Sequence, residues 1–385
     1  ITKLFVTNSV KKKHKITMEN NHVTVLEIDL NAIAANFNYF KSKLHKTTKV
    51  LVVVKAFGYG SDAVKIAKFL ASKVDYFAVA YLDEGIALRN AGITTPILVL
   101  HPQKSNFQKI IEYHLEPNIY SVNLLKAFVE TAKILKSQNY PIHLTFNTGL
   151  NRLGFAKNEV SEILSIINTQ KEVLVKSIFS HIAASEDLNE REFTLQQINT
   201  FNAVSSAFIS QVNNTPFKHM LNTSGILNYA TEAQFDMVRL GIGLYGFGNA
   251  TAETHKLKNV LTLKSVISQI HTIKKGETVG YNRAFKATST LKTATIPIGH
   301  ADGIGRQYGN GKGFVNIHGK PAPIIGNVCM DMIMVNISHI DCKEGDEAIV
   351  FGPEQTAERL AETVNTISYE LITAISKRVK RIFIK

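Results

Sequence analysis

Residues 50–60 read VLVVVKAFGYG, an apolar run that ends in a lysine and a glycine-rich turn. Five apolar, mostly β-branched residues in a row predict a strand that is covered on both faces, as in a parallel sheet. Lys55 follows directly at the carboxyl end of this strand. The same order of apolar run, polar end and helical stretch recurs along the chain, so this segment is the first unit of the predicted fold.

Eight such runs, separated by amphipathic stretches, lie between residues 50 and 241. The predicted strands are Val50–Val54, Tyr76–Ala80, Pro96–Leu100, Glu116–Tyr120, Ile142–Phe146, Val175–His181, Phe217–Asn222 and Met237–Gly241. Eight strands with helical crossovers predict an α/β fold of the (β/α)8 TIM-barrel type, with a doubly wound open sheet as the alternative. Strand-like runs such as Thr262–Ile273 and short turns dominate beyond about residue 250. We therefore expect a barrel over residues 23–254 and a mainly β domain over residues 255–385.

The composition limits the classes of protein to consider. The 385 residues carry 44 Lys and Arg against 31 Asp and Glu, and 45% of them are hydrophobic. That is too apolar for a disordered chain, and no run approaches the ~20 apolar residues of a membrane span. The two cysteines, Cys329 and Cys342, are too few for a disulfide framework, which indicates a cytoplasmic protein.

The positive charge is partly concentrated at the start of the sequence. Residues 1–20 contain five lysines and one glutamate and lack apolar periodicity. We expect residues 1–22 to be a basic flexible tail or linker. The remaining sequence has no motif that reads nucleic acid, so we expect neither nucleic acid nor membrane as a partner.

A barrel of this type places its chemistry at the carboxyl ends of its strands. The polar residues found there are Lys55, Arg152, His181, Asn222, Thr223, Ser224 and Arg239, and Gly241 follows the last strand. Each has an ordinary alternative: Lys55 could simply carry its ammonium to water, His181 could be a satisfied residue at the barrel mouth, and Thr223 could cap a helix. Their convergence on one rim favours a functional site.

The chemistry of this set favours a phosphorylated cofactor held by a lysine. Loops after the last two strands commonly bind phosphate in such barrels. The donors available there are the hydroxyls of Thr223 and Ser224 and the backbone at Gly241 and Ile242. Lys55 could form a Schiff base with an aldehyde, and Arg239 could donate to a ring nitrogen. Pyridoxal 5′-phosphate is therefore the favoured cofactor.

Seven motifs resemble, in the same order, those of alanine racemase, a fold-type III family of pyridoxal-phosphate enzymes. They are VVVKAFGYG, NTGLNRLGF, HMLNTSG, VRLGIGLYG, VGYNRAF, IPIGHADGIGR and GNVCMDM. The resemblance runs from about Val23 to the C-terminus. It implies an isomerase that interconverts L- and D-alanine by a two-base mechanism and supplies D-alanine for peptidoglycan.

The resemblance also implies roles for single residues. Lys55 would be the Schiff-base lysine and one catalytic base, and Tyr281 would be the second base, delivered by a partner subunit. The implied cofactor contacts are Tyr59, His181, Asn222, Thr223, Arg239, Gly241 and Ile242. Arg152 and the backbone N–H of Met330 would lie near the substrate carboxylate. The implied form is a head-to-tail homodimer with a small amino acid as substrate and no metal.

Some positions depart from the family pattern. Thr145 stands where many members have a modified lysine that orients the substrate-side arginine, and Asn147 replaces an aspartate. We therefore expect a bound anion or Asn147 to orient Arg152. Lys377 stands where some members have a tyrosine that contacts the phosphate.

Two functional alternatives stay open from the sequence. One is a racemase of broader specificity that acts on serine or lysine, and the other is a non-catalytic protein that binds pyridoxal phosphate. The second domain and Tyr281 argue against the non-catalytic protein. In the loop next to Met330, Asp331 could pair with Arg306.

Overall fold

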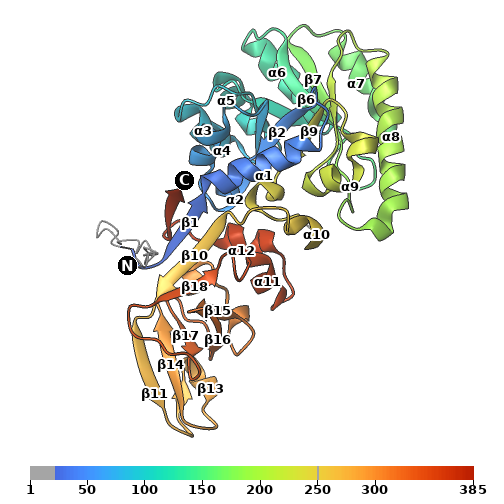
Figure 1. Ribbon diagram of the computed structural model, residues 1–385. Coiled ribbons are helices and arrows are strands. Elements are labelled where there is room, and N and C mark those ends of the chain that lie inside the picture. Colours follow the sequence, from blue (N-terminus) through green and yellow to red (C-terminus); the bar gives the residue numbers. More distant parts are fainter. Residues whose placement is uncertain (1–21, 249–250) are drawn as a thin grey trace, which may run out of the picture.

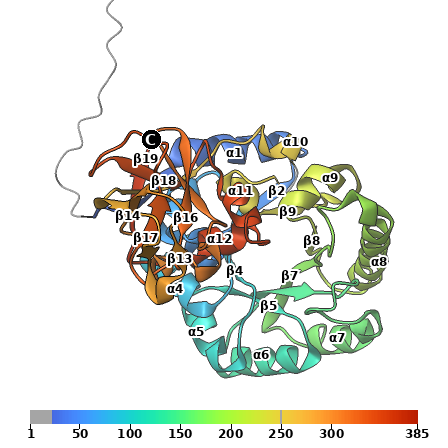
Figure 2. The same ribbon diagram turned by 90° about the horizontal axis from the view of Figure 1, so that it is seen from below.

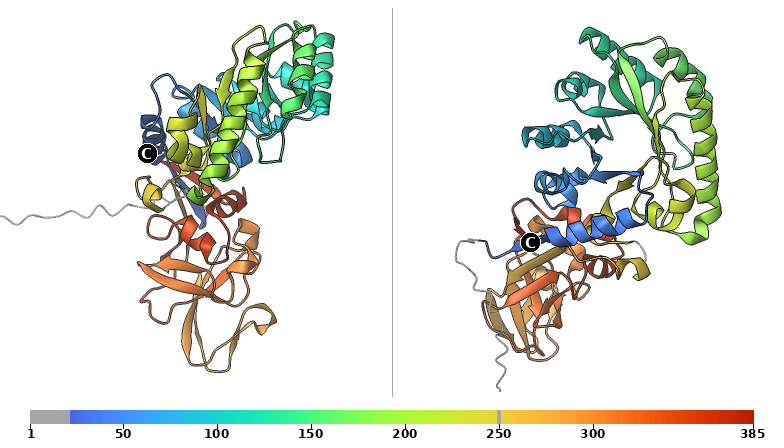
Figure 3. Two further views of the ribbon diagram at one scale, coloured as in Figure 1. Left: turned by 90° about the vertical axis from the view of Figure 1, so that its right-hand side faces the viewer. Right: turned by 45° about the horizontal axis from the view of Figure 1, so that its top comes forward.

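The computed structural model of the chain describes residues 22–248 and 251–385. A barrel and a β-rich region are stacked one on the other, so the described chain is elongated (Figures 1 and 3). The predicted tail over residues 1–22 lies outside the described residues, except for His22. Within the described part, no helix is long and apolar enough to cross a membrane.

Eight parallel strands close into a barrel, in the order in which they occur in the chain. They are β2 (Lys49–Val53), β3 (Tyr76–Val79), β4 (Ile97–Val99), β5 (Glu116–Ile119), β6 (Tyr140–Thr145), β7 (Val173–Phe179), β8 (Phe217–His219) and β9 (Met237–Leu240). Each predicted strand is present, with its ends shifted by at most three residues. The predicted barrel is confirmed, and the open sheet is excluded because β9 pairs with β2.

Helices cover the outside of the barrel, as the view from below shows (Figure 2). They are α1 (Leu30–Ser42), α3 (Ala63–Leu70), α4 (Leu82–Asn90), α5 (Phe107–Glu112), α6 (Val122–Ile134), α7 (Val160–Ile167), α8 (Arg191–Ile209) and α9 (Thr223–Ala233). In α8, Ile198, Phe201, Val204 and Phe208 are buried at helical spacing, so one apolar face packs on the sheet. This layer covers the outer face of the strands.

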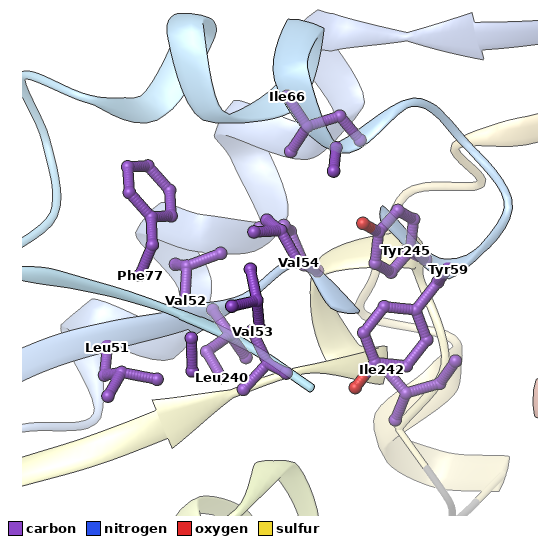
Figure 4. Close-up of a cluster of buried hydrophobic side chains, with 14 of the residues drawn as sticks. Leu51, Val52, Val53, Val54, Tyr59, Ile66, Phe77, Leu240, Ile242 and Tyr245 are labelled. Atoms are coloured by element: carbon purple, nitrogen blue, oxygen red, sulfur yellow. The ribbon is translucent and has the colours of Figure 1, made fainter. Parts of the chain in front are cut away.

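The core around β2 fixes the position from which Lys55 leaves the barrel. Figure 4 shows Val52 and Val54 close to Phe77 of β3 and Ile66 of α3. All four of these side chains are fully buried. Removing so much apolar surface from water stabilises β2 strongly, so the residue that follows it is held in one place.

The β-rich region is built on a nine-stranded sheet with the order β11-β14-β17-β16-β15-β18-β10-β1-β19. Its strands are β1 (Val25–Asp29), β10 (Leu261–Val266), β11 (Gln269–Ile273), β14 (Leu291–Ile296), β15 (Phe314–Ile317), β16 (Lys320–Ile325), β17 (Ile333–Asn336), β18 (Glu347–Phe351) and β19 (Lys380–Ile384). A small hairpin, β12 (Thr278–Val279) and β13 (Phe285–Lys286), projects beside it. The predicted mainly β C-terminal region is confirmed.

Two details of this sheet differ from the sequence-based picture. The boundary between residues 254 and 255 stays a prediction, but β1, which it assigns to the barrel domain, pairs with β10 and β19 in this sheet. The single predicted strand Thr262–Ile273 is two strands. The chain breaks between them because Ile267 donates its backbone N–H to Asp346, just before β18, whereas Ser268 donates to Thr295 of β14.

Two short helices connect β18 to β19 and lie next to the barrel, α11 (Ala357–Glu362) and α12 (Ser368–Ala374) (Figure 1). The turn after β2 packs closely against α12. A side chain at Gly60 would need the space that the carbonyl oxygen of Ile372 occupies, so glycine is required at this contact. Arg381 completes this junction by donating to the carbonyl oxygen of Gly60 from Nε at 3.0 Å and from Nη2 at 2.8 Å. The C-terminal segment therefore helps to hold the turn that carries Lys55.

Candidate active site

A cavity of about 640 Å³ opens at the carboxyl ends of the barrel strands. Nine of the predicted site residues line it: Lys55, Tyr59, Arg152, His181, Asn222, Thr223, Arg239, Gly241 and Ile242. Three of these side chains are cationic, and along its described lining the cavity has no aspartate or glutamate. A low-dielectric pocket with this charge attracts small anions.

Lys55 begins an unusual turn, labelled α2 (Lys55–Tyr59) in Figure 1. Ala56, Phe57 and Gly58 have φ of 53°, 55° and 63°, and Tyr59 also has a positive φ. Left-handed backbone costs about 1–2 kcal/mol for each residue other than glycine. Strain of this kind persists where the surroundings enforce it, often at functional sites. Here the turn bends the chain back so that Tyr59 lies in the same cavity as Lys55.

The environment of Lys55 lowers the pKa of its amine. Burial lowers the pKa of Lys55, and the charges of Arg152 and Arg239 lower it further. Glu84 opposes this shift. Its carboxylate is held by the backbone N–H groups of Ala56 at 2.6 Å and of Ala80 at 2.7 Å. An amine with a lowered pKa is a better nucleophile and base near neutral pH.

The wall beside Lys55 offers hydrogen-bond donors around Gly241, because β9 pairs with β2. Thr223 is the first residue of α9, and its Oγ1 accepts from the backbone N–H of Gly241 at 3.3 Å and of Gly243 at 3.2 Å. A side chain at Gly241 would lie 2.6 Å from the Tyr59 hydroxyl, so only glycine leaves room there. Figure 4 shows the Tyr59 ring next to Ile242, which begins the short helix η4 (Ile242–Tyr245). Hydroxyls and helix N-termini together suit a phosphate group.

Arg239 is buried between two histidines. Its Nη1 donates to Nδ1 of His219 at 2.8 Å, and its Nη2 donates to Nδ1 of His181 at 2.9 Å and to two backbone carbonyls. Burial, followed by the charge of Arg152, lowers the pKa of Arg239 to about 9. Burial and the Arg239 charge lower the pKa of both histidines well below the usual range, so both are neutral. A neutral His181 that accepts at Nδ1 presents Nε2–H as a donor.

Arg152 does not make the contacts that the sequence suggested. Asn147 donates from Nδ2 to Asn151 at 2.9 Å, and its Oδ1 accepts from the backbone of its own loop, so its hydrogen bonds with the described residues shape that loop and do not go to Arg152. The Thr145 hydroxyl donates to Oδ1 of Asn118. Orientation of Arg152 by Asn147 is therefore wrong for this structure, and orientation by a bound anion stays a prediction.

Tyr281 and Met330 lie apart from this cavity, on the β-rich region. They line a second, shallower pocket of about 360 Å³ together with Gly280, Cys329, Asp331, Met332 and Met334. The side chains of Tyr281 and Met330 are 73% and 58% exposed. Two large apolar groups exposed side by side are typical of a surface that another molecule covers. Within one chain, the structure therefore does not bring these two residues to Lys55.

The loop around Met330 is held differently from the expected pair of Asp331 and Arg306. Asp331 accepts from Nη2 of Arg378 at 2.7 Å. The same guanidinium forms two bonds with buried Asp302, at 2.7 Å from Nε and 3.0 Å from Nη2. The pairing predicted with Arg306 is wrong because Arg378, from the C-terminal segment, bridges both carboxylates.

Sequence reasoning missed several residues that line the cavity. Tyr369, on α12, reaches it, and its ring centroid lies 6.2 Å from that of Tyr59. Lys377, expected near the phosphate, instead has its ammonium 4.8 Å from the centroid of the Phe57 ring and does not line the cavity. Asn118 also lines it, and its place at the end of β5 is the signal that could have identified it.

No group of three or more histidine, cysteine, aspartate or glutamate side chains that could hold a metal ion occurs in the described ranges. The polar lining of the cavity includes lysine, arginine, histidine and hydroxyl groups. Such a set suits a reaction in which a proton is moved and a negative charge is stabilised.

Comparisons with known proteins show what the chain is similar to. A family model described as the N-terminal domain of alanine racemase matches residues 28–248, and one for the C-terminal domain matches residues 260–383. The alanine racemase of Helicobacter pylori strain G27 is 36% identical over 374 residues, which are 93% of this chain and 98% of that protein.

Solved structures show the same similarity. Alanine racemase from Clostridium difficile 630 has a TM-score of 0.88 and 34% identity, over 95% of this chain and 97% of that one. Alanine racemase from Bartonella henselae, solved with covalently bound pyridoxal phosphate, has a TM-score of 0.86 and 30% identity, over 94% of this chain and 100% of that one.

Proposed function

Because the chain belongs to the alanine racemase family and is an isomerase that interconverts L- and D-alanine, we propose that Lys55 binds pyridoxal phosphate. We also propose that a second copy of the chain completes the site with its Tyr281. One observation carries the proposal. A single cavity contains Lys55, Arg239 and a cluster of phosphate donors, whereas Tyr281 is exposed outside it.

The residues of the cavity fit pyridoxal phosphate. Lys55 supplies the primary amine that an aldehyde requires, with a lowered pKa. The hydroxyls of Tyr59 and Thr223 and the start of η4 at Ile242 would hold the phosphate. When bound, the cofactor supplies a conjugated ring that stabilises the negative charge left by removal of the α-proton.

Arg239 supports racemisation over other reactions of the same cofactor. Its Nε–H and one N–H of Nη1 have no partner among the described residues, and Arg239 lines the cavity. A guanidinium donates and never accepts, so it would keep the ring nitrogen unprotonated. Negative charge at the α-carbon would then be short-lived, which favours its reprotonation over transamination.

Inversion requires a proton acceptor on one face of the substrate and a donor on the other. Lys55 would serve one face. Tyr281 would serve the other from a second copy, because it is exposed on its own chain. Arg152, in the cavity, would bind the substrate carboxylate. A site that needs Tyr281 from a second copy would make a head-to-tail homodimer the active form.

Chiral analysis of L-alanine, L-serine and L-lysine incubated with the protein and pyridoxal phosphate tests the function. We expect alanine to be racemised, and equally fast racemisation of serine or lysine would favour the broader specificity. Racemisation of none of the three would reject the proposal.

The residue assignments need separate measurements. Reduction with borohydride followed by peptide mass spectrometry should locate the cofactor on Lys55. In deuterated water, Tyr281→Phe should lose α-proton exchange from one enantiomer only. Tyr113→Phe, at a half-buried tyrosine away from the cavity lining, is the matched control and should retain both exchanges. Cofactor on another lysine, or equal loss of both exchanges, would contradict the assignments.

A further inference from the structure

Five polar side chains form a continuous hydrogen-bonded chain through the interior of the barrel. One comes from each of five consecutive strands, β5 to β9, which are neighbours in the ring of Figure 2. In order they are Glu116, His143, Ser177, His219 and Arg239. Barrel interiors are ordinarily filled with branched apolar side chains, so this polar chain needs an explanation.

The contacts are short at every step. Oε2 of Glu116 lies 2.6 Å from Nε2 of His143, and Nδ1 of His143 lies 2.6 Å from Oγ of Ser177. The same oxygen lies 3.0 Å from Nε2 of His219. Nδ1 of His219 lies 2.8 Å from Nη1 of Arg239. Four hydrogen bonds therefore join a carboxylate to the guanidinium at the cavity.

The two ends fix the direction of the bonds. Arg239 can only donate, so Nδ1 of His219 accepts, and neutral His219 carries its proton on Nε2 and donates it to Ser177. At the other end the Glu116 carboxylate can only accept, so His143 donates from Nε2. Ser177 accepts from His219 and has one hydroxyl proton to donate, and Nδ1 of His143 is the acceptor beside it. Every bond then points from Arg239 toward Glu116.

Burying these five polar side chains costs free energy unless every one of them is hydrogen-bonded. His143, Ser177 and His219 are fully buried, and Arg239 is 5% exposed. In the described part of the chain, no carboxylate contacts Arg239 directly; its hydrogen bonds go to two histidines and two carbonyl oxygens. A buried charge needs compensation, and aligned hydrogen bonds polarise one another. Glu116 supplies an opposite charge at the far end of the aligned bonds.

We propose that Glu116, His143 and Ser177 are positioning residues that lock His219 as an acceptor and thereby hold Arg239 toward the cofactor ring. The proposal deepens the proposed function, since it assigns to that reaction three residues that do not line the cavity. If His219 carried a proton on Nδ1, it would repel Arg239. Glu116, His143 and Ser177 prevent protonation of His219 on Nδ1, and they do so from positions that do not line the cavity.

Imidazole ¹⁵N and ¹H spectra of the histidine-labelled holoenzyme test the proposal. His143 and His219 should both be protonated on Nε2 alone. Glu116→Gln keeps an acceptor of the same shape but removes the charge, so the Nε2 proton signals of both histidines should move in the direction of weaker hydrogen bonds. In the Ser177→Ala background, Glu116→Gln should leave the His219 signal unchanged, because the connection is already broken.

Cofactor affinity provides an independent measurement. Glu116→Gln and Ser177→Ala should each raise the dissociation constant of pyridoxal phosphate by about tenfold or more, as expected for loss of one charge-assisted hydrogen bond. Ser177→Thr keeps the hydroxyl, so its dissociation constant for pyridoxal phosphate should stay close to that of the wild type. Ser205→Ala is the matched control, since Ser205 is equally buried on α8 but donates to the carbonyl of Asn202. It should change neither the spectra nor the affinity.

Several outcomes would overturn the proposal. In the spectra, these are protonation of His143 on both ring nitrogens and a His219 signal that does not move in Glu116→Gln. In the affinity measurement, it is the same dissociation constant for Glu116→Gln and wild type. Failure of the proposed function is recognised separately, because a wild-type chain that does not racemise alanine would contradict that function without altering these spectra.

Discussion

Replacing Gly241 with alanine should displace the Tyr59 hydroxyl from the phosphate side of the cavity. The new Cβ would lie 2.6 Å from that hydroxyl, about 0.8 Å closer than the 3.4 Å at which ordinary contact begins. The Tyr59 ring has little freedom to move, because the Tyr245 ring lies against it with centroids 5.0 Å apart (Figure 4). Loss of one hydrogen bond to a charged group costs about 1.5–3 kcal/mol, so pyridoxal phosphate should bind about 10- to 150-fold more weakly.

The assay is an absorbance titration of cofactor-stripped protein with pyridoxal phosphate, and Tyr59→Phe provides the control. In that variant the atom facing Gly241 is the ring carbon, which lies 3.5 Å from the added Cβ, an ordinary contact. Tyr59→Phe alone should weaken binding to a similar extent, and adding Gly241→Ala to it should change little. A Gly241→Ala effect of the same size in both backgrounds would refute the reasoning.

Three further predictions follow from single residues. Arg152→Gln should raise the pKa of Lys55, so the acid limb of the reaction of Lys55 with pyridoxal phosphate in stripped protein should move to higher pH. An unmoved limb would show that the charge of Arg152 does not lower this pKa. Arg239→Glu should increase side products such as pyruvate relative to racemised alanine, because a carboxyl group can hold the ring nitrogen protonated, and an unchanged product ratio would contradict this. Phe40→Ala should lower the free energy of unfolding by about 3–5 kcal/mol in denaturant titrations, because Phe40 is 1% exposed and packs against Gly243. A loss below about 1 kcal/mol would show that the surrounding core closes over the gap.

The barrel could be predicted because its signal is local. Each strand is a short apolar run, and amphipathic stretches with apolar residues at helical spacing separate the strands. The position of β1 could not be predicted in this way. Val25 pairs with Lys264 and Lys380, and no periodicity within β1 indicates partners so far away in the sequence. The division of Thr262–Ile273 into two strands depends on similar long-range bonds.

The cavity could be predicted to the extent that its residues stand at strand ends. Lys55 and Arg239 follow that rule and line one cavity. His143 and Ser177 do not, because they occupy inward positions within strands, where a polar residue looks like an isolated exception to an apolar pattern. Their role depends on the register of the five neighbouring strands β5 to β9. Tyr281 is a different case, since no single chain shows which site it would serve.

The sharing of the site between two copies is the central claim, and mixed dimers test it most directly. Dimers of Lys55→Ala alone or of Tyr281→Phe alone should be inactive. A mixed dimer, purified through two different tags, would contain one site with both groups intact and one with neither, so it should recover about half of the wild-type racemase activity. A mixed dimer as inactive as its parents would show that Tyr281 does not complete the site of the other copy.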